Sequence, residues 1–450
     1  MVWADHPDRP LNGGRPCPVP PTMMVMVMVM KVYSRERLAR LASERGMPDE
    51  YLHDMRVVSS VLPFKVNQYV VDELIDWSSA PDDPIFRQTF PHRDMLPSDI
   101  YDHLSNLVLS EADPGVIRKA TRDAHARLNP NPGAQLEANV PTHGGRRLHG
   151  LQHKYAETVL IFPSQGQTCH AYCGYCFRWA QFVGNAEIRQ STSEISDVVT
   201  YLGASPGVTD VLFTGGDPMI MSAPVLNRWV SPLLEPTLER IRTFRFGTKA
   251  LSYWPARFTT DPDADDLLRL FERIVADGRH VAVMAHFSHP RELTTDEARR
   301  AIARIRATGA VIRAQAPLIA HVNDRAWDWA TMWQRLVELG IVPYYMFVER
   351  DTGARSYFSV PLARAWQIYT DALRSVSGLA RTARGPVMSA APGKVLVDGV
   401  VRIGGAELFS LRMLQARDVA QVGRQFFARH DPTADWFDDL RPAPGSWWPT

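Results

Sequence analysis

Residues 280–316 read HVAVMAHFSHPRELTTDEARRAIARIRATGAVIRAQA and hold one complete strand–helix–strand unit. The first eight residues and the last seven are mainly apolar runs of strand length, and between them apolar residues recur on one face of a helix. Thr295 is placed to cap this helix, and Gly309 is placed to end it. Such a unit gives two parallel strands with a helix packed across them.

Similar units extend in both directions along the chain. Apolar runs of strand length also occupy 157–162, 208–213, 241–246 and 341–348, and helical segments such as 263–276 lie between most of them. Six strands alternating with helices predict an α/β fold, a partial (β/α)6 barrel whose parallel sheet is closed or nearly closed. The chemistry of such barrels lies at the carboxyl ends of the strands, so polar motifs are expected there.

The predicted barrel, residues 148–375, follows a mainly helical N-terminal region, residues 31–147. In that region Ser34 and Asn67 are each placed to cap a helix. Residues 1–30, which are rich in Pro, Gly and alternating Met and Val, are expected to be disordered or to precede the true start of translation.

The C-terminal segment, residues 376–450, is predicted to hold a hairpin and a helix. The hairpin is expected over 395–409 with its turn at Asp398-Gly399, and the helix over 411–430.

Composition excludes some classes of function. The chain has 450 residues, of which 45% are hydrophobic and 22% charged, and its net charge of +1 gives no electrostatic reason for a nucleic-acid or membrane partner. No stretch reaches transmembrane length, so we expect a cytoplasmic protein. Of four cysteines, three lie within eight residues, which favours a metal or catalytic site over a disulfide framework.

The motif with the clearest chemistry is TCHAYCGYCFR, residues 168–178. Cys169, Cys173 and Cys176 are spaced so that their thiolates can bind three irons of a [4Fe–4S] cluster and leave the fourth iron open. S-adenosylmethionine (SAM) can chelate an open iron, and an electron passed to its sulfonium can release a 5′-deoxyadenosyl radical. The alternative is a structural zinc site, which needs a fourth ligand. Candidates for that ligand are His170, His153 and His149.

A second motif, FTGGD at 213–217, directly follows a predicted strand. Gly215 and Gly216 would let backbone groups approach a ligand closely, and Asp217 supplies an acceptor for an ammonium. Beside a cluster-bound SAM, this suits the methionyl amino group. Taken alone, the motif is more typical of an ordinary turn.

Other predicted strands also end in polar residues. The fourth ends with His286 and the fifth with Gln315, both candidate cofactor-binding residues, and the sixth is followed by Glu349, Arg350 and Asp351. The alternative for each residue is a solvated strand end, and His286 is equally compatible with a half-buried structural histidine.

In the order of its motifs the chain resembles the lysine 2,3-aminomutase (KamA-like) family of radical SAM proteins, from about Phe64 to Val400. Besides the cysteine and G-G-D motifs, the matching segments are DDPIFRQ (82–88), HKY (153–155), HFSHPRELT (286–294), VND (322–324), PYY (343–345) and APGK (391–394).

The resemblance implies SAM, a [4Fe–4S] cluster and pyridoxal phosphate (PLP) as cofactors, and a 2,3-amino shift through radical intermediates. It places PLP on Lys394 as a Schiff base, Lys154 and Tyr155 beside that cofactor, and the substrate α-carboxylate on Arg178. It also implies a small-molecule substrate, a reductant such as flavodoxin or ferredoxin, and no nucleic-acid or membrane partner, and it is compatible with a homo-oligomer.

Three departures from the family pattern concern PLP and the substrate. The family's P-G-G-G-G-K is P-G-K at 392–394, which changes the reach of the lysine. The phosphate-binding H-R-Y-P-D-R is HKYAET at 153–158, where Thr158 replaces the second arginine. Two aspartates that hold the distal ammonium of lysine fall at about Arg350 and near Ser389, so an anionic or polar substrate end is expected instead.

Three hypotheses follow. The first is a PLP-dependent 2,3-aminomutase acting on an amino acid other than lysine. The second is a radical SAM enzyme without PLP, in which Lys394 has a structural or phosphate-binding role. The third is a non-catalytic protein whose metal serves structure or regulation. An alignment shifted by one residue would put Asp351 in the place of Arg350.

Overall fold

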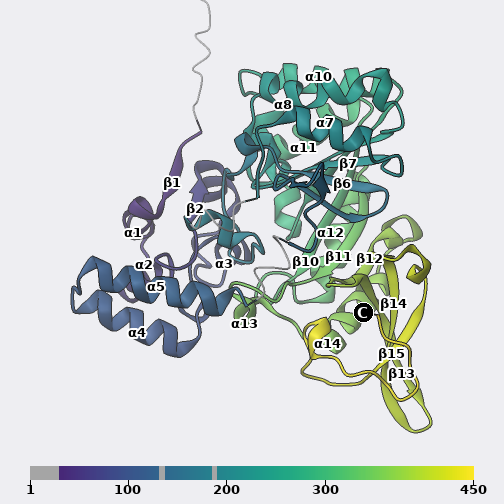
Figure 1. Ribbon diagram of the computed structural model, residues 1–450. Helices are drawn as coiled ribbons and strands as arrows, with labels where there is room; N and C mark the ends of the chain where they lie inside the picture. The colour runs from purple at the N-terminus through teal and green to yellow at the C-terminus, as the bar shows by residue number, and fades with distance from the viewer. Residues whose placement is uncertain (1–29, 131–136, 185–189, 450) are drawn as a thin grey trace, which may run out of the picture.

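The computed structural model describes residues 30–130, 137–184 and 190–449 (Figure 1). Cys17 and the rest of residues 1–29, for which disorder or a late start is expected, lie outside this part of the chain. No helix within it is long and apolar enough to cross a membrane.

The N-terminal region is mainly helical. Asn67 acts as a cap, because its Oδ1 accepts a hydrogen bond from the Val70 amide at 3.0 Å. Ser34 precedes the first helix, but its hydroxyl donates to the Glu36 carboxylate instead of capping. The elements are β1 (Val32–Ser34), α1 (Arg35–Glu44), α2 (Asp49–Val58), β2 (Lys65–Asn67), α3 (Pro84–Thr89), α4 (Ser98–Leu109) and α5 (Pro114–Leu128).

The core is one sheet of eleven strands in the order β15-β14-β13-β12-β11-β10-β9-β8-β7-β6-β5. Every neighbouring pair from β6 to β12 is parallel, and the pairs beyond are antiparallel. The six predicted strands are confirmed as β6 to β11, and β12 adds a seventh parallel strand. The bounds are β5 Leu151–Tyr155, β6 Thr158–Ile161, β7 Asp210–Phe213, β8 Thr243–Thr248, β9 His280–His286, β10 Val311–Leu318, β11 Val342–Val348, β12 Arg384–Ser389, β13 Gly393–Ile403, β14 Ala406–Ala416 and β15 Gln425–Arg429.

Helices connect the parallel strands and cover the sheet (Figure 1). Thr295 caps α11 by accepting from the Ala298 amide, and Gly309 ends the segment with a φ of +85°. Apolar faces of these helices and the sheet form the largest buried cluster. The helices are α7 (Ile195–Gly203), α8 (Ala223–Val230), α9 (Ala250–Tyr253), α10 (Ala264–Ala276), α11 (Asp296–Ala307), α12 (Ala326–Glu338), α13 (Arg355–Phe358) and α14 (Leu362–Arg374).

The barrel is partial, because the ladder of strands runs from β5 to β15 without returning on itself. Side chains bridge the gap. Lys154 on β5 donates to the Ala390 carbonyl in the β12–β13 connection. Arg417, just after β14, donates to the Ala391 carbonyl at 3.1 Å and to Asn139 Oδ1 at 2.6 Å. We call these contacts of Lys154 and Arg417 the seam.

The predicted hairpin turn at Asp398-Gly399 is wrong. β13 runs through both residues, and the chain turns at Gly404-Gly405, whose φ angles are +57° and +85°. A two-residue hairpin turn of this hand needs positive φ at both positions, which two glycines supply without strain. Asp398-Gly399 instead lies at a register shift of the β13–β14 ladder, and Asp398 accepts from Arg412 at 2.7 Å.

The predicted helix over 411–430 is also wrong, because β14 continues to Ala416 and β15 follows. Leu411 and Met413 are buried on one face of β14, and Phe426 and Ala428 on one face of β15. This is the period of two that a sheet with one covered face requires. The C-terminal segment is therefore an antiparallel extension of the barrel sheet.

Candidate functional site

The three cysteines lie on the loop after β6, at the carboxyl end of that strand. Lys65 on β2 holds this loop, since its Nζ donates to Thr168 Oγ1 at 2.8 Å and to the Cys169 carbonyl at 3.1 Å. The Tyr172 amide donates back to the Lys65 carbonyl, and the Gly174 amide donates to the Gln88 carbonyl, each at 2.8 Å. The N-terminal region therefore fixes the backbone of the cysteine loop.

Cys169, Cys173 and Cys176 are half-buried free thiols. Burial raises the pKa of each, to about 12 for Cys176 and well above the usual range for Cys169, so iron must displace protons when it binds. No three His, Cys, Asp or Glu side chains converge on one metal ion in the described ranges. A cubane binds each thiolate at a different iron, so three thiols spread along one loop suit a cluster better than a single zinc ion.

Gly215 and Gly216 pack directly against the cysteine loop. A Cβ on Gly216 would lie 2.3 Å from the Thr168 carbonyl oxygen, and one on Gly215 would lie 2.2 Å from Gln167 Nε2. The Gly216 amide donates to the Gly166 carbonyl, and the Asp217 amide donates to that of Thr168. The close backbone approach expected at these glycines is therefore made to the chain itself.

Asp217 is buried and accepts hydrogen bonds from four groups. Its carboxylate accepts from the Thr248 hydroxyl at 2.8 and 2.9 Å, the Lys249 and Met219 amides at 2.9 Å, and His170 Nε2 at 3.1 Å. It is thus oriented beside the cysteine loop by strands β7 and β8.

His286 and Gln315 meet at the ends of β9 and β10. His286 Nε2 lies 3.4 Å from Gln315 Nε2. Burial, together with the charge of Lys249, lowers the pKa of His286 to about 4, so this imidazole is neutral at physiological pH. A neutral ring beside an amide can donate and accept hydrogen bonds to a ligand without carrying charge.

A buried ion pair lies between the cysteine loop and the N-terminal region. Lys249 Nζ lies 3.0 Å from Glu292 Oε2, and Glu292 is fully buried. Glu292 also accepts from Gln88 Nε2 at 2.9 Å, from the Ser288 amide at 3.0 Å and from the Ser252 hydroxyl. A buried carboxylate satisfied in this way is stable only while all its partners stay in place.

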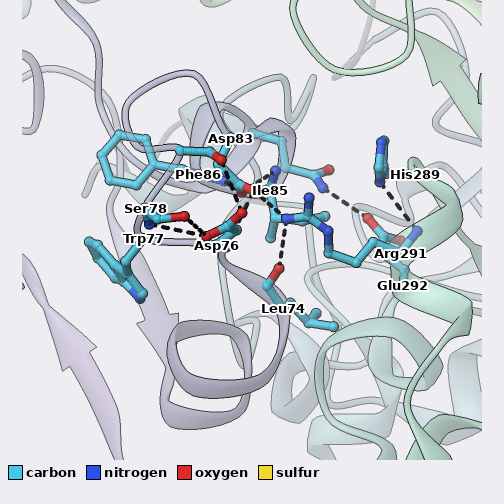
Figure 2. A network of polar contacts seen from close by, with 12 residues as sticks. Leu74, Asp76, Trp77, Ser78, Asp83, Ile85, Phe86, His289, Arg291 and Glu292 are labelled. Atoms are coloured by element: carbon cyan, nitrogen blue, oxygen red, sulfur yellow. Dashed lines mark hydrogen bonds and ion pairs between the residues drawn. The ribbon is translucent and has the colours of Figure 1, made fainter.

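Figure 2 shows the contacts that join Glu292 and its neighbour Arg291 to the N-terminal region. Arg291, next to Glu292, donates to the Asp83 carboxylate and to the Leu74 carbonyl. Asp83 also accepts from the Ile85 and Phe86 amides at 2.9 Å. The DDPIFRQ and HFSHPRELT segments therefore meet each other, and their charged residues join the N-terminal region to the barrel.

Two arginines flank one aromatic ring at the barrel mouth. The guanidinium carbons of Arg178 and Arg350 lie 5.2 and 5.5 Å from the Phe177 ring centroid. No acidic side chain in the described ranges forms an ion pair with Arg178, and the ion pair of Arg350 is a long one, 3.7 Å to Asp351. Burial and the charge of Arg350 lower the pKa of Arg178 to about 10, so Arg178 remains cationic at neutral pH.

Glu349 adds no charge to offset these arginines at neutral pH. It is 7% exposed, and burial raises its pKa to about 8. The buried guanidinium of Arg178 and the half-buried one of Arg350 therefore form a positive site suited to carboxylate groups.

Lys394 lies on β13 in an aromatic setting. Its Nζ donates to Gln415 Oε1 at 2.8 Å and lies 5.0 Å from the Tyr155 ring centroid and 5.7 Å from that of Tyr345. Burial, with the charge of nearby Arg245, lowers its pKa to about 7. A lysine that is partly neutral at physiological pH fits imine formation with an aldehyde cofactor.

Lys154 lies close to Lys394 and is desolvated as well. Burial, followed by the charges of Arg417, Arg350 and Lys394, lowers the pKa of Lys154 to about 7. Its contact with the Ala390 carbonyl fixes the chain just before Lys394. The amine of Lys394 and these cations suit the aldehyde and phosphate of PLP.

The known proteins to which this chain is similar in sequence carry the same enzyme name. A protein of Aquifex aeolicus described as "Putative L-lysine 2,3-aminomutase" is 29% identical over 87% of this chain and 91% of its own length. The L-lysine 2,3-aminomutase of Escherichia coli is 26% identical over 79% and 92%. That of Clostridium subterminale is 25% identical over 56% and 57%. No model of a protein family matches the chain.

The chain is therefore similar to the KamA-like (lysine 2,3-aminomutase) family of radical SAM proteins. Among solved structures, a radical SAM methyltransferase from Sphaerobacter thermophilus covers 78% of this chain and 93% of its own, at 14% identity and a TM-score of 0.36, which is too low to carry an argument. Proteins of the KamA-like family use SAM and a [4Fe–4S] cluster, and the thiols on the loop after β6 have the spacing for it.

The structure brings the predicted residues into two groups. Cys169, Cys173, Cys176, Gly215, Gly216, Asp217, His286 and Gln315 follow the strands β6 to β10, whereas Arg178, Arg350, Lys154, Tyr155 and Lys394 lie around the barrel mouth and the seam. Sequence reasoning missed Lys65, Tyr253 and the role of Glu292. Of these three, only Glu292 could have been found from the sequence, because it lies in the HFSHPRELT segment that resembles the family.

Proposed function

We propose that this chain is a radical SAM enzyme that catalyses a 2,3-amino shift on an amino acid with an anionic side chain. The observation that supports it best is the pair of buried Arg178 and half-buried Arg350, two guanidiniums beside the cysteine loop whose one acidic neighbour is Asp351, at 3.7 Å from Arg350. Such a pair favours a ligand with two carboxylates.

In this proposal Cys169, Cys173 and Cys176 hold the cluster, and Asp217 orients the methionyl end of SAM through the G-G-D turn. When bound, the cluster and SAM supply a 5′-deoxyadenosyl radical after one-electron reduction. The buried surroundings of the loop exclude water, which protects a reactive radical from side reactions.

Arg178 would hold the α-carboxylate, and Arg350 would hold the distal group. Because both guanidiniums flank Phe177, a substrate with two carboxylates would be fixed at its two ends. Lys394 would carry PLP, which when bound supplies a site for the migrating amine. Lys154 fixes the loop before Lys394 and adds a positive charge for the phosphate.

The test is anaerobic reconstitution with iron, sulfide and PLP, followed by SAM cleavage with glutamate or lysine present. We expect 5′-deoxyadenosine formation that depends on Cys169, Cys173 and Cys176, and PLP absorbance that is lost in Lys394→Ala but kept in Lys119→Ala, a change at an exposed lysine of α5. A wild-type protein that binds the cluster but never PLP would contradict the amino-shift proposal.

A second candidate is a radical SAM enzyme without PLP. The hydrogen bond of Lys394 to Gln415 and its packing on Tyr155 give this lysine a structural role without any cofactor. Substrate loss coupled to 5′-deoxyadenosine in PLP-free protein would favour this candidate.

A further inference from the structure

Tyr253 is a buried tyrosine that the proposed reaction does not use. It ends α9, directly after β8, and is 0% exposed. Its hydroxyl has no hydrogen-bond partner among the residues that the structure describes. A buried hydroxyl without a partner costs about 1–3 kcal/mol, so a fold retains one where a ligand completes it.

The surroundings of Tyr253 point to one of the cysteines. Cys173 packs against the apolar cluster that contains Tyr253 and against a second cluster that contains Tyr175. The Tyr175 hydroxyl lies 2.6 Å from Ser288 Oγ and is a second phenol beside Cys173. Burial and then the charge of Cys173 raise the pKa of Tyr253 well above its usual range, which fits a phenol facing this sulfur.

Two further contacts hold the phenol in place and improve it as a donor. The Asn67 side-chain amide donates to the Tyr253 carbonyl at 2.8 Å and fixes the end of α9. Lys249 Nζ lies 4.3 Å from the ring centroid and is itself fixed by Glu292. A cation over the ring draws electron density from the hydroxyl, which strengthens its hydrogen bond to an anion.

We infer that the Tyr253 hydroxyl donates a hydrogen bond to the Cys173 thiolate of the loaded cluster and thereby raises the reduction potential of that cluster. Reduction adds one negative charge, shared between the irons and their sulfur ligands, and a donor aimed at a ligand sulfur stabilises the added charge. Tyr253 is then a positioning residue for the cluster. This inference rests on the proposed binding of the cluster by the three cysteines.

The test is the midpoint potential of the cluster in the full-length, anaerobically reconstituted protein, measured by EPR-monitored redox titration. In Tyr253→Phe we expect the ratio of reduced to oxidised cluster at a fixed potential to fall about tenfold, which is about 59 mV for one electron. Tyr69→Phe is the matched control, because it removes a hydrogen bond to Thr295 at 2.6 Å in the same apolar cluster and should leave the potential unchanged.

A second variant keeps the shape of the ring. Difluorotyrosine at position 253 lowers the pKa of the phenol and makes it a stronger donor, so the potential should rise relative to wild type. If the Tyr253→Phe protein takes up no cluster, the midpoint potential of the difluorotyrosine variant alone tests the inference.

The two failures are distinguishable. If the wild type and both variants at position 253 bind the cluster and show the same midpoint potential, this inference alone is overturned. A wild type that takes up no iron and sulfide would overturn the proposed function and this inference together.

Discussion

At the scale of single residues, the main feature of the site is two guanidiniums with little acidic charge beside them. Arg178 is buried and Arg350 half-buried beside Phe177, the ion pair of Arg350 with Asp351 is long, and burial raises the pKa of Glu349 to about 8. Burying like charges together is unfavourable unless a ligand neutralises them. Specificity therefore depends on these few side chains.

Arg350→Asp should reverse the preference for the distal group. We expect the binding ratio of glutamate to lysine, measured by calorimetric titration of the loaded protein, to fall by on the order of 100-fold, since one attractive contact is replaced by a repulsive one. Arg299→Asp, an exposed change on α11, is the control and should leave the ratio unchanged. A wild type that prefers lysine would contradict this prediction.

Lys394 should react with aldehydes at an unusually low pH. The reactive form is the neutral amine, and with a pKa of about 7 it is present above pH 7 and lost below it. Labelling of Lys394 by PLP and borohydride, followed by mass spectrometry, should therefore rise with pH and level off a little above pH 7. Labelling of a lysine in an unstructured reference peptide should still be rising at pH 9, because an unperturbed lysine has a pKa of about 10.4. Parallel pH profiles for Lys394 and the peptide lysine would show that Lys394 is not desolvated.

At the scale of elements, the loop after β6 and the turn after β7 act as one unit. Gly215 and Gly216 are required because the two backbones are in contact, with the Gly216 amide bonded to Gly166 and the Asp217 amide bonded to Thr168. Whatever moves this turn also moves the cysteines.

Gly216→Ala should therefore lower both stability and iron content. Its Cβ would overlap the Thr168 backbone, so we expect a loss of about 1–3 kcal/mol in the free energy of unfolding, measured in urea, and a lower iron content after reconstitution. Gly203→Ala at the end of α7, where a Cβ meets nothing within 4 Å, is the control and should keep full iron content. Equal iron content in the two variants would show that the turn does not position the cysteine loop.

The sequence predicts the parallel strands and the cysteine loop because periodicity and ligand spacing are local signals. It does not predict the course of β13, since Asp398-Gly399 has the letters of a turn and only the pairing with Arg412 on β14 makes it part of a strand. Lys65 is missed for the same reason, because its contact with the cysteine loop joins residues 103 positions apart.

At the scale of the whole molecule, the N-terminal region serves as a brace for the site. Lys65 and Gln88 hold the cysteine loop, and the contact of Asp83 with Arg291 attaches this region to the loop after β9 (Figure 2). The brace explains why the resemblance to relatives begins well before the barrel.

Asp83→Ala should weaken the brace and the cluster site together. Removing the carboxylate leaves two buried helix amides without an acceptor, so we expect a loss of about 1–3 kcal/mol in urea unfolding and faster proteolysis of the N-terminal region. Asp72→Ala, which breaks only a surface ion pair with Arg45, should cost less than about 1 kcal/mol. If both changes cost the same, the brace contributes no more than a surface contact.

The seam has a consequence for hydrogen exchange. A full ladder of backbone hydrogen bonds holds β9 and β10 on both sides, whereas β5 pairs with another strand on one side only. Its contacts with the β12–β13 connection and with β13, among the described residues, are made by side chains such as Lys154 with the Ala390 carbonyl and Tyr155 with Lys394. Local opening there breaks a few side-chain contacts instead of a ladder, so its free energy is lower. Amides of β5 and of residues 389–391 should exchange with deuterium in minutes while those of β9 and β10 stay protected, and uniform protection would show that the barrel opens only as a whole.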